Sequence, residues 1–351
     1  MSRRGSAQRG LARAALPLVL AAVVLGTLLA APVSAATVAP SAQRGPRVYT
    51  VDVVGLDVAG SSFPLNSVNT AFVRARMKEV SDYYLKSTGG QILLRFGTFL
   101  GFRPTSASPC DFWSVKAAAD ARLRQAGRWP NLYLALTDYR CDRLPGKSMN
   151  AAPGSVSFGW EASDVWAHEL GHGLGLGHST SFSCPQGPIS ICSRPQSLPG
   201  FSEYDDEDDI MGPSAADSAL TYGLLNPAQL QRLGAFPSSG QYILRAKPTR
   251  TLVYRLRAWD SGIGKRSVTL TWGSTPLYIT YDAVDNYPYD DVTPGVCVHF
   301  AYRNSSGILS SGMTLPRALT KNRRHIGNMG VTVAVGRTTP DYADIAIRPA
   351  L

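Results

Sequence analysis

The stretch from His168 to His178, His-Glu-Leu-Gly-His-Gly-Leu-Gly-Leu-Gly-His, constrains this chain more than any other part of its sequence. On a helix, residues four apart lie one turn apart on one face, so His168 and His172 can direct their imidazoles at one metal ion. The chain must then reverse for His178 to return, and Gly175 stands where a left-handed cap would end the helix. The sequence therefore predicts a helix, a glycine turn and a three-histidine metal site.

Three histidine ligands leave one position of a tetrahedral zinc ion open, which is typical of catalytic sites. Zinc lowers the pKa of its water, and Glu169 is then placed to take the proton as general base and deliver it to a leaving amine. The expected cofactor is one catalytic Zn²⁺, and activity should fall in acid as the ligands protonate. Gly171 and Gly173 each cost a helix about 1 kcal/mol relative to alanine, which indicates close backbone packing or ligand approach there.

A second segment, Tyr204-Asp-Asp-Glu-Asp-Asp-Ile-Met-Gly212, follows downstream. Together the two segments resemble the metzincin metallopeptidases, and among them the gametolysin-type family, whose second motif is close to Tyr-Gly-Asp-x-x-Asp-Val-Met-Gly. The resemblance extends to Ser179 and to the cysteines at 184 and 192. It implies a metzincin-like zinc endopeptidase domain over residues 47–235, with Met211 in a tight turn beneath the metal as a packing residue. It also implies extracellular or cell-wall proteins as substrates.

The acidic residues of this second segment depart from the family pattern, because Asp205 replaces the usual glycine and Asp208 adds an acid. The acidic residues are Glu203, Asp205, Asp206, Glu207, Asp208 and Asp209. They predict a solvated acidic loop, with a Ca²⁺ site that stiffens the turn as the alternative. No tyrosine closely follows Met211, so none is assigned to stabilising an oxyanion.

The N-terminus predicts export. Four arginines precede an apolar run over residues 14–33, which ends in the small-x-small cleavage signature Val33-Ser34-Ala35. We interpret residues 1–35 as a signal peptide and 36–46 as a linker, with a membrane anchor as the alternative if cleavage fails. No later apolar run is long enough to span a bilayer, so the mature protein is expected to be secreted without a stable membrane span.

Five cysteines in an exported chain predict disulfides. Cys184 and Cys192 would close a short loop rich in proline and glycine. Cys110 and Cys141 flank a helix-strand unit and would form the second bridge. Cys297 is then left over in a strand-like run, where a buried small hydrophobic role is expected. Spacing alone does not prove this connectivity.

Alternating patterns predict an α/β (α+β) layer in the first part of the chain. The expected strands are 47–54, 91–102 and 131–137, and the expected helices are 65–85 and 111–126, the latter capped by Asp111. Residues 155–159 are interpreted either as an edge strand that pairs with an extended substrate or as an ordinary loop. Beyond Gly234, short β-type runs between turn residues predict a C-terminal all-β sandwich-like accessory domain over residues 236–351.

Composition and charge narrow the partners. A chain of 351 residues with 44% hydrophobic and 17% charged residues is globular in composition. The formal net charge of +10 includes four signal-peptide arginines, which leaves a modest +6. The one basic cluster, residues 321–324, lacks interleaved aromatics, so protein or peptide substrates are expected and nucleic acid is not. The rival hypotheses are a non-catalytic zinc protein and a wall-binding or adhesion protein that uses its C-terminal β domain; the oligomeric state is open.

Overall fold

A computed structural model describes most of the chain beyond residue 44. The described residues are 45–58, 68–138, 141, 146–148, 154–158, 162–192, 197–198, 201–204, 206, 209–212, 223–273, 275–283, 295–303, 309–313 and 324–350. The predicted signal peptide, most of the linker, three of the acidic residues (205, 207 and 208) and residues 321–323 of the basic cluster lie outside these ranges.

The first sheet is mixed and has the order β2-β1-β3-β5-β4. Its strands are β1 (Arg47–Val58), β2 (Ile92–Thr105), β3 (Leu132–Thr137), β4 (Gly146–Ser148) and β5 (Gly154–Phe158). Parallel pairing joins β2, β1, β3 and β5, and only β4 runs antiparallel. Because β5 pairs on both sides, residues 155–158 form neither the edge strand nor the loop that the sequence suggested, and β4 takes the position at this edge among the described strands.

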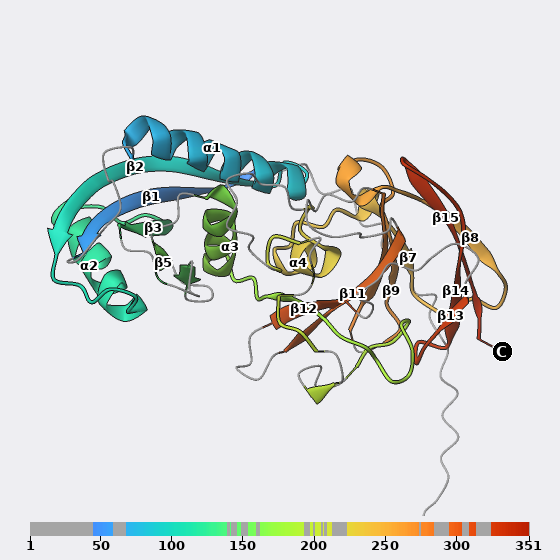
Figure 1. Ribbon diagram of the computed structural model, residues 1–351. Coiled ribbons are helices and arrows are strands. Elements are labelled where there is room, and N and C mark those ends of the chain that lie inside the picture. The colour runs from blue at the N-terminus through green and yellow to red at the C-terminus, as the bar shows by residue number, and fades with distance from the viewer. Residues whose placement is uncertain are drawn as a thin grey trace, which may run out of the picture. The chain divides into compact units, whose positions relative to one another are not determined.

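Helices cover both faces of this sheet, which gives the predicted α/β layering (Figure 1). The helices α1 (Thr70–Ser87) and α3 (Ser163–Gly173) share one buried cluster with Leu132 and Leu134, while α2 (Phe112–Gln125) shares another with Tyr133. Successive β3 side chains point to opposite faces of the sheet. Because helices cover both faces, this strand is buried along its whole length.

The helix starts follow from their caps. Helix α1 begins later than the sequence pattern suggested, at residue 70, because the Asn69 side chain accepts a hydrogen bond of 3.0 Å from the backbone N–H of Phe72. Asp111 caps α2 as predicted, by accepting from Trp113 N at 3.2 Å. None of the helices in the described ranges is both long and apolar enough to cross a membrane.

Two further sheets contain the C-terminal strands. One has the order β6-β12-β11-β10-β9-β7 and the other β13-β14-β15-β8. Their bounds are β6 (Ser179–Ser181), β7 (Gln241–Leu244), β8 (Leu252–Arg257), β9 (Ser267–Leu270), β10 (Leu277–Asp282), β11 (Gly295–Arg303), β12 (Leu309–Met313), β13 (Arg324–Ile326), β14 (Val331–Thr339) and β15 (Tyr342–Pro349). Buried side chains of both sheets form one apolar cluster, which includes Ile279, Val298, Val333 and Ile345.

Strand β6 connects the part of the chain that forms the first sheet with the sheets of the C-terminal strands. It follows His178 directly and pairs in parallel with β12, so that Ser179 lies opposite Ser311. The short helix α4 (Pro227–Arg232) packs against β11 and β12. The strand that directly follows the third histidine therefore belongs to a sheet whose other strands lie beyond residue 240.

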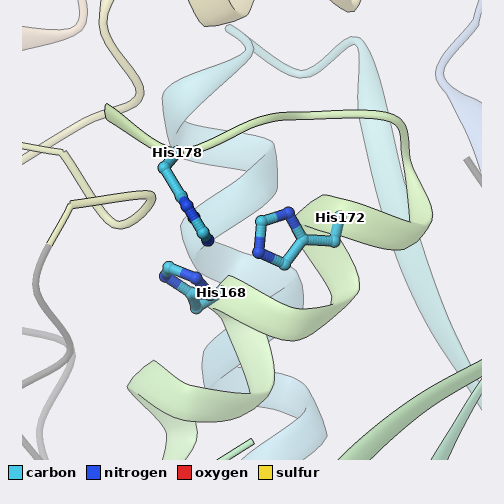
Figure 2. A group of neighbouring side chains, drawn as sticks. All are labelled: His168, His172 and His178. Atoms are coloured by element: carbon cyan, nitrogen blue, oxygen red, sulfur yellow. The ribbon is translucent and has the colours of Figure 1, made fainter. Parts of the chain in front are cut away.

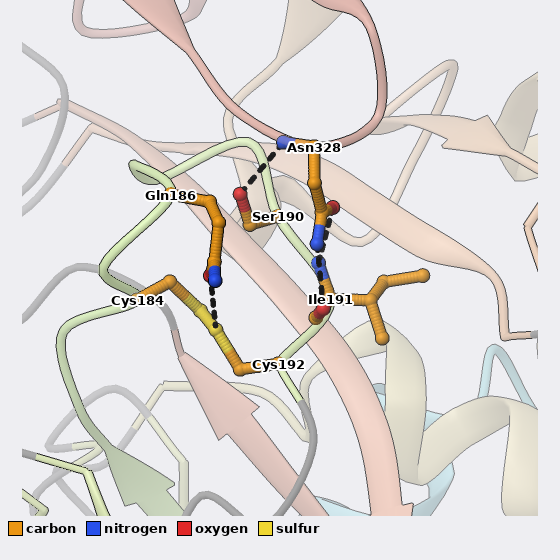
Figure 3. The surroundings of a disulfide bond; sticks show 6 residues. All are labelled: Cys184, Gln186, Ser190, Ile191, Cys192 and Asn328. Carbon is orange, nitrogen blue, oxygen red and sulfur yellow. Dashed lines mark hydrogen bonds between the residues drawn. A yellow bond between two sulfur atoms is a disulfide. The ribbon is translucent and has the colours of Figure 1, made fainter.

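Both predicted disulfides are present. Cys110 bonds to Cys141, and Cys184 bonds to Cys192, while Cys297 forms no disulfide within the described ranges and is buried in β11, as expected. The short loop closed by the second bridge is held by a turn of the C-terminal part (Figure 3). Asn328 donates from its backbone to Ser190 Oγ at 2.9 Å, and its side-chain amide exchanges two hydrogen bonds with the backbone of Ile191, at 2.9 and 3.1 Å.

Candidate metal centre

Helix α3 carries His168, Glu169 and His172 and is buried over its first nine residues. Its core side chains, among them Trp166 and Leu170, lie in the cluster that α1 and the first sheet also form. The Tyr84 hydroxyl of α1 donates to Ala167 O at 2.8 Å. This packing fixes the helix against the sheet and thereby fixes both histidines.

The glycine at 171 allows a close approach beneath the site. A Cβ atom added there would lie 2.5 Å from Met211 Sδ and 2.8 Å from Tyr84 Oη. The expected close packing of this glycine is thus present, and Met211 is fully buried against the helix backbone. Met211 O also accepts a hydrogen bond of 2.7 Å from Ser179 N, so the methionine turn supports the chain just after the third histidine.

The helix ends at a glycine in the left-handed conformation, as predicted. Gly175 has φ of 95°, its N–H donates to His172 O at 2.8 Å, and Leu176 N donates to Gly171 O at 2.9 Å. This pair of bonds is a Schellman motif, which satisfies helix carbonyls and reverses the chain. We call residues 174–178 the return segment, because it brings His178 back toward the helix.

The three histidines meet (Figure 2), and their ligand atoms all lie within 4.8 Å of one another. Ring centroids are 4.8 Å apart for His168 and His172, 4.8 Å for His172 and His178, and 5.5 Å for His168 and His178. Two rings come from one helix face and the third from the return segment above it. No other group of three or more candidate ligands occurs within the ranges that the structure describes.

Each histidine has its Nδ1 atom engaged by a different oxygen. His168 Nδ1 lies 2.8 Å from Ile210 O, His172 Nδ1 lies 2.9 Å from Leu176 O, and His178 Nδ1 lies 2.7 Å from Glu203 Oε1. These acceptors require a proton on Nδ1, which leaves the Nε2 lone pair of each ring available to a metal. Three such nitrogens with oriented second partners fit a zinc ion.

Burial keeps the imidazoles neutral, which is the form that binds metal. It holds the pKa of His168 well below its usual range and lowers the pKa of His172 to about 4. The pKa of His178 is also lowered by burial, but the Glu203 carboxylate opposes this effect.

Glu169 directly follows His168 in α3, and no protein group binds one of its carboxylate oxygens within the described ranges. The residue is 6% exposed, and its Oε2 atom has no hydrogen-bond partner among the described residues. Burial raises the pKa of this carboxyl well above its usual range, and Lys147 of β4 partly offsets the shift. The Ser155 hydroxyl fixes the backbone by donating to Glu169 O at 2.9 Å. A buried carboxylate oxygen without a protein partner can bind water or substrate, and a closed structural site has no need for such a group.

Two residues next to His178 received no role at this site from the sequence. Glu203 binds its Nδ1 atom, and the Tyr204 ring lies with its centroid 4.0 Å from that of His178. Tyr204 has φ of 76°, an uncommon conformation for a tyrosine, and burial raises its pKa to about 12. A β-bridge between Ser181 and Ser202 brings this segment to the histidine. Tyr204 is the first residue of the second motif, and this position was the one sequence signal for a role at the site. The spacing of the motif did not show that the Tyr204 ring contacts His178.

The acidic segment differs from the prediction of a solvated loop. Asp206 and Asp209 are both 0% exposed. Asp209 accepts from Met211 N at 2.8 Å and Asn226 N at 2.6 Å, and Asp206 accepts from the Asn226 amide at 3.1 Å. Burial and the neighbouring Asp206 raise the pKa of Asp209 to about 7. These carboxylates anchor the methionine turn, and the described residues give no support for a calcium site.

His299 lies in the core, outside the three-histidine group. It is 2% exposed in β11, and its Nε2 atom lies 3.4 Å from Asp206 Oδ2. His325 lies in β13, in the sheet that does not contain β6.

The fold is mixed α/β, and its site is a three-histidine centre beside a carboxylate, an arrangement typical of catalytic metal sites. No protein-family model and no curated protein matches the chain. Among solved structures, archaemetzincin from Methanopyrus kandleri is 16% identical with a TM-score of 0.28, over 52% of this chain and 93% of that one. OgpA from Akkermansia muciniphila is 11% identical with a TM-score of 0.37, over 87% and 94%.

A third similar structure is a chaperone-substrate complex, 16% identical with a TM-score of 0.30. The match covers 40% of this chain and only 27% of that chain, so this protein corresponds to about a quarter of its length. Similarities this weak identify no family. The geometry of the histidines and Glu169 therefore carries the functional conclusion.

Proposed function

We propose that this protein is a secreted zinc-dependent metalloendopeptidase of the metzincin type, similar to the gametolysin family. One observation carries the proposal: three histidines whose Nδ1 atoms are all engaged lie together beside the buried, unpartnered carboxylate of Glu169. His168, His172 and His178 would hold the ion. A zinc ion bound there supplies Lewis acidity, which polarises a carbonyl group and makes water more acidic.

Glu169 is the general base in this proposal. Its free Oε2 takes a proton from the attacking water and then passes it to the amine that leaves, so that one peptide bond is broken and the water's atoms are divided between the two products. Burial raises the pKa of this carboxyl, and a cation held by the histidines would lower it again, so that Glu169 would be ionised and able to accept a proton. Tyr204, beside His178, is close enough to the centre to contact a substrate.

In this proposal an extended substrate pairs with β4. This strand lies at one edge of the first sheet among the described strands, and it carries Lys147, whose charge acts on Glu169. Free backbone groups on an outer strand can pair with a peptide. The proposed catalytic domain comprises residues 47–235, and residues 236–351 form the proposed accessory domain. Extracellular or cell-wall proteins are the proposed substrates, and two disulfides support export.

The test compares the purified mature protein with Glu169→Gln on unfolded casein, with zinc content measured for both. We expect the variant to bind zinc as the wild type does and to lose a factor of about 10²–10⁴ in kcat, because only the proton acceptor is changed. Chelation should abolish wild-type cleavage and added zinc should restore it. Full activity of Glu169→Gln would refute the assigned base, and a wild type that binds no zinc would refute the metallopeptidase.

A further inference from the structure

The return segment is too rich in glycine to position a histidine by itself. Its sequence alternates leucine and glycine, and Gly175 and Gly177 lose more conformational freedom on folding than any other residue type would. The helix bonds of α3 end at Leu176. The position of His178 must therefore be imposed from outside the segment.

Helix α4 provides three side-chain donors for this purpose. The Gln229 amide donates to Gly177 O at 2.6 Å, and Arg232 Nε donates to Gly175 O at 2.6 Å. The Asn226 amide donates to Ser179 Oγ at 3.2 Å. His178 is thus the residue between two positions that α4 holds.

The register of these contacts is regular. The donors are three residues apart, a spacing that places side chains on one face of a helix. The acceptors, Gly175 O, Gly177 O and Ser179 Oγ, are two residues apart in the chain. The two segments run in opposite directions, so that the first donor meets the last acceptor. One face of the helix therefore donates hydrogen bonds to alternate residues of the chain on both sides of His178.

The bonds of Asn226 and Gln229 are buried, and those of Asn226 continue to β12. Asn226 and Gln229 are 3% and 1% exposed, respectively. Ser311 N donates to His178 O at 3.1 Å, and Ser311 Oγ also accepts from the Asn226 amide at 2.8 Å. A buried carbonyl that loses its donor remains unsatisfied, so the return segment would have to shift if Gln229 lost its amide.

We propose that Asn226, Gln229 and Arg232 are positioning residues of the metal centre, which act through the return segment to hold His178 in place for zinc. This inference rests on the proposed function, because it assumes that His178 binds the ion. It assigns α4 to the metal centre, although none of its residues is a metal ligand.

The test is the zinc affinity of the full mature chain, measured by competition with a chromophoric chelator. Gln229→Met keeps the length of the side chain and removes its donor. We expect zinc affinity to fall about 10- to 100-fold, the loss typical of partners that orient a metal ligand. Gln231→Met is the matched control, since Gln231 is exposed on the same helix, and its affinity should equal that of the wild type.

A second variant guards against misfolding. Arg232→Met removes the donor to Gly175 at the exposed end of α4, where folding should be unaffected, and should weaken zinc binding about tenfold. Combining either variant with His178→Ala gives the decisive readout: zinc affinity should then equal that of His178→Ala alone. A general loss of stability would instead lower affinity further in the double variant.

The outcomes separate the two proposals. If the wild type binds zinc and both Gln229→Met and Arg232→Met bind it equally well, the role of α4 is refuted while the peptidase stands. Additive losses with His178→Ala also refute it, because the effect would not pass through that histidine. If the wild type binds no zinc, the proposed function fails first.

Discussion

Helix α3 and the return segment contribute to the same centre by different means. Helix α3 presents two histidines from 11 consecutive helical residues, and its own backbone hydrogen bonds set their spacing. The return segment presents one histidine from a run without regular structure. Beyond the bonds that α3 makes to Gly175 and Leu176, its hydrogen-bond partners are α4, β12 and Glu203. Local geometry fixes the first two ligands, and tertiary contacts fix the third.

This difference predicts where the centre is vulnerable. A change within α3 must break a helix that packs against α1 and the first sheet, whereas the return segment depends on a few polar bonds. Both regions nevertheless place the same kind of nitrogen, with Nδ1 engaged and Nε2 free. Variants of the two regions should therefore lose the same kind of ligand nitrogen but differ in how far protein stability falls.

Removing a ligand from either region should have the largest effect. His172→Ala and His178→Ala each leave two nitrogens, so zinc affinity should fall by more than the roughly 10- to 100-fold lost when an outer partner is removed. Competition with a chelator measures this directly. His325→Ala in β13 is the control and should bind zinc normally. Wild-type affinity in His178→Ala would break the comparison, because the return segment would then supply no ligand.

Alanine in place of Gly171 or Gly175 should have the next largest effect, for two different reasons. Gly171→Ala forces a Cβ into Met211 and Tyr84, and such overpacking costs about 1–3 kcal/mol. Gly175→Ala places a side chain at φ of 95°, in the left-handed region, which costs roughly 1–2 kcal/mol. Urea unfolding of the zinc-free protein measures both losses.

The matched control for these glycines is Gly101→Ala. Gly101 lies in β2 with nothing within 4 Å of an added Cβ, so no loss is expected there. If Gly171→Ala were as stable as the wild type, the helix would not be pressed against the methionine turn. The proposed difference between Gly171, where alanine would clash, and Gly175, where alanine would be strained by its positive φ, would then be wrong.

Sequence reasoning succeeded where the structure is locally encoded. Histidine spacing, the glycine cap and the Asp111 cap all depend on residues within a few positions of one another, and each is found as predicted. Both cysteine pairs expected in an exported chain are also bonded, although spacing alone did not prove their connectivity.

It failed where partners are distant in the chain. Acidity alone suggested a solvated loop, but Asp206 and Asp209 are buried because the Asn226 backbone and amide, about 20 positions away, supply donors. The edge position of residues 155–159 was wrong because the three-residue strand β4 is too short to leave a pattern. The α4 contacts have a spacing of three, but nothing in that spacing indicates the carbonyls that they bind.

Acid titration of the zinc-free protein should show the smallest difference between the two regions. Burial lowers the pKa of His172 to about 4, so the folded state stays neutral while the unfolded state gains a proton near pH 6.5. Stability from this residue is therefore present above pH 6.5 and is lost as the pH falls toward 4. His178 alone has a carboxylate partner, Glu203, which favours its charged form and raises its pKa against the effect of burial. His178 should therefore protonate first.

Glu203→Gln makes this last contrast measurable. The amide oxygen can still accept from His178 Nδ1, but the negative charge is lost, so the pKa of His178 should fall toward that of His172. NMR titration of the imidazole protons in the zinc-free protein would follow each ring separately. His172, whose Nδ1 partner is a backbone carbonyl, is the internal reference and should shift less than His178, because only the repulsion between the two rings links it to the change. Equal shifts at both rings would mean that Glu203 acts on the whole centre rather than on the return segment, and the distinction between the two regions would not extend to their charges.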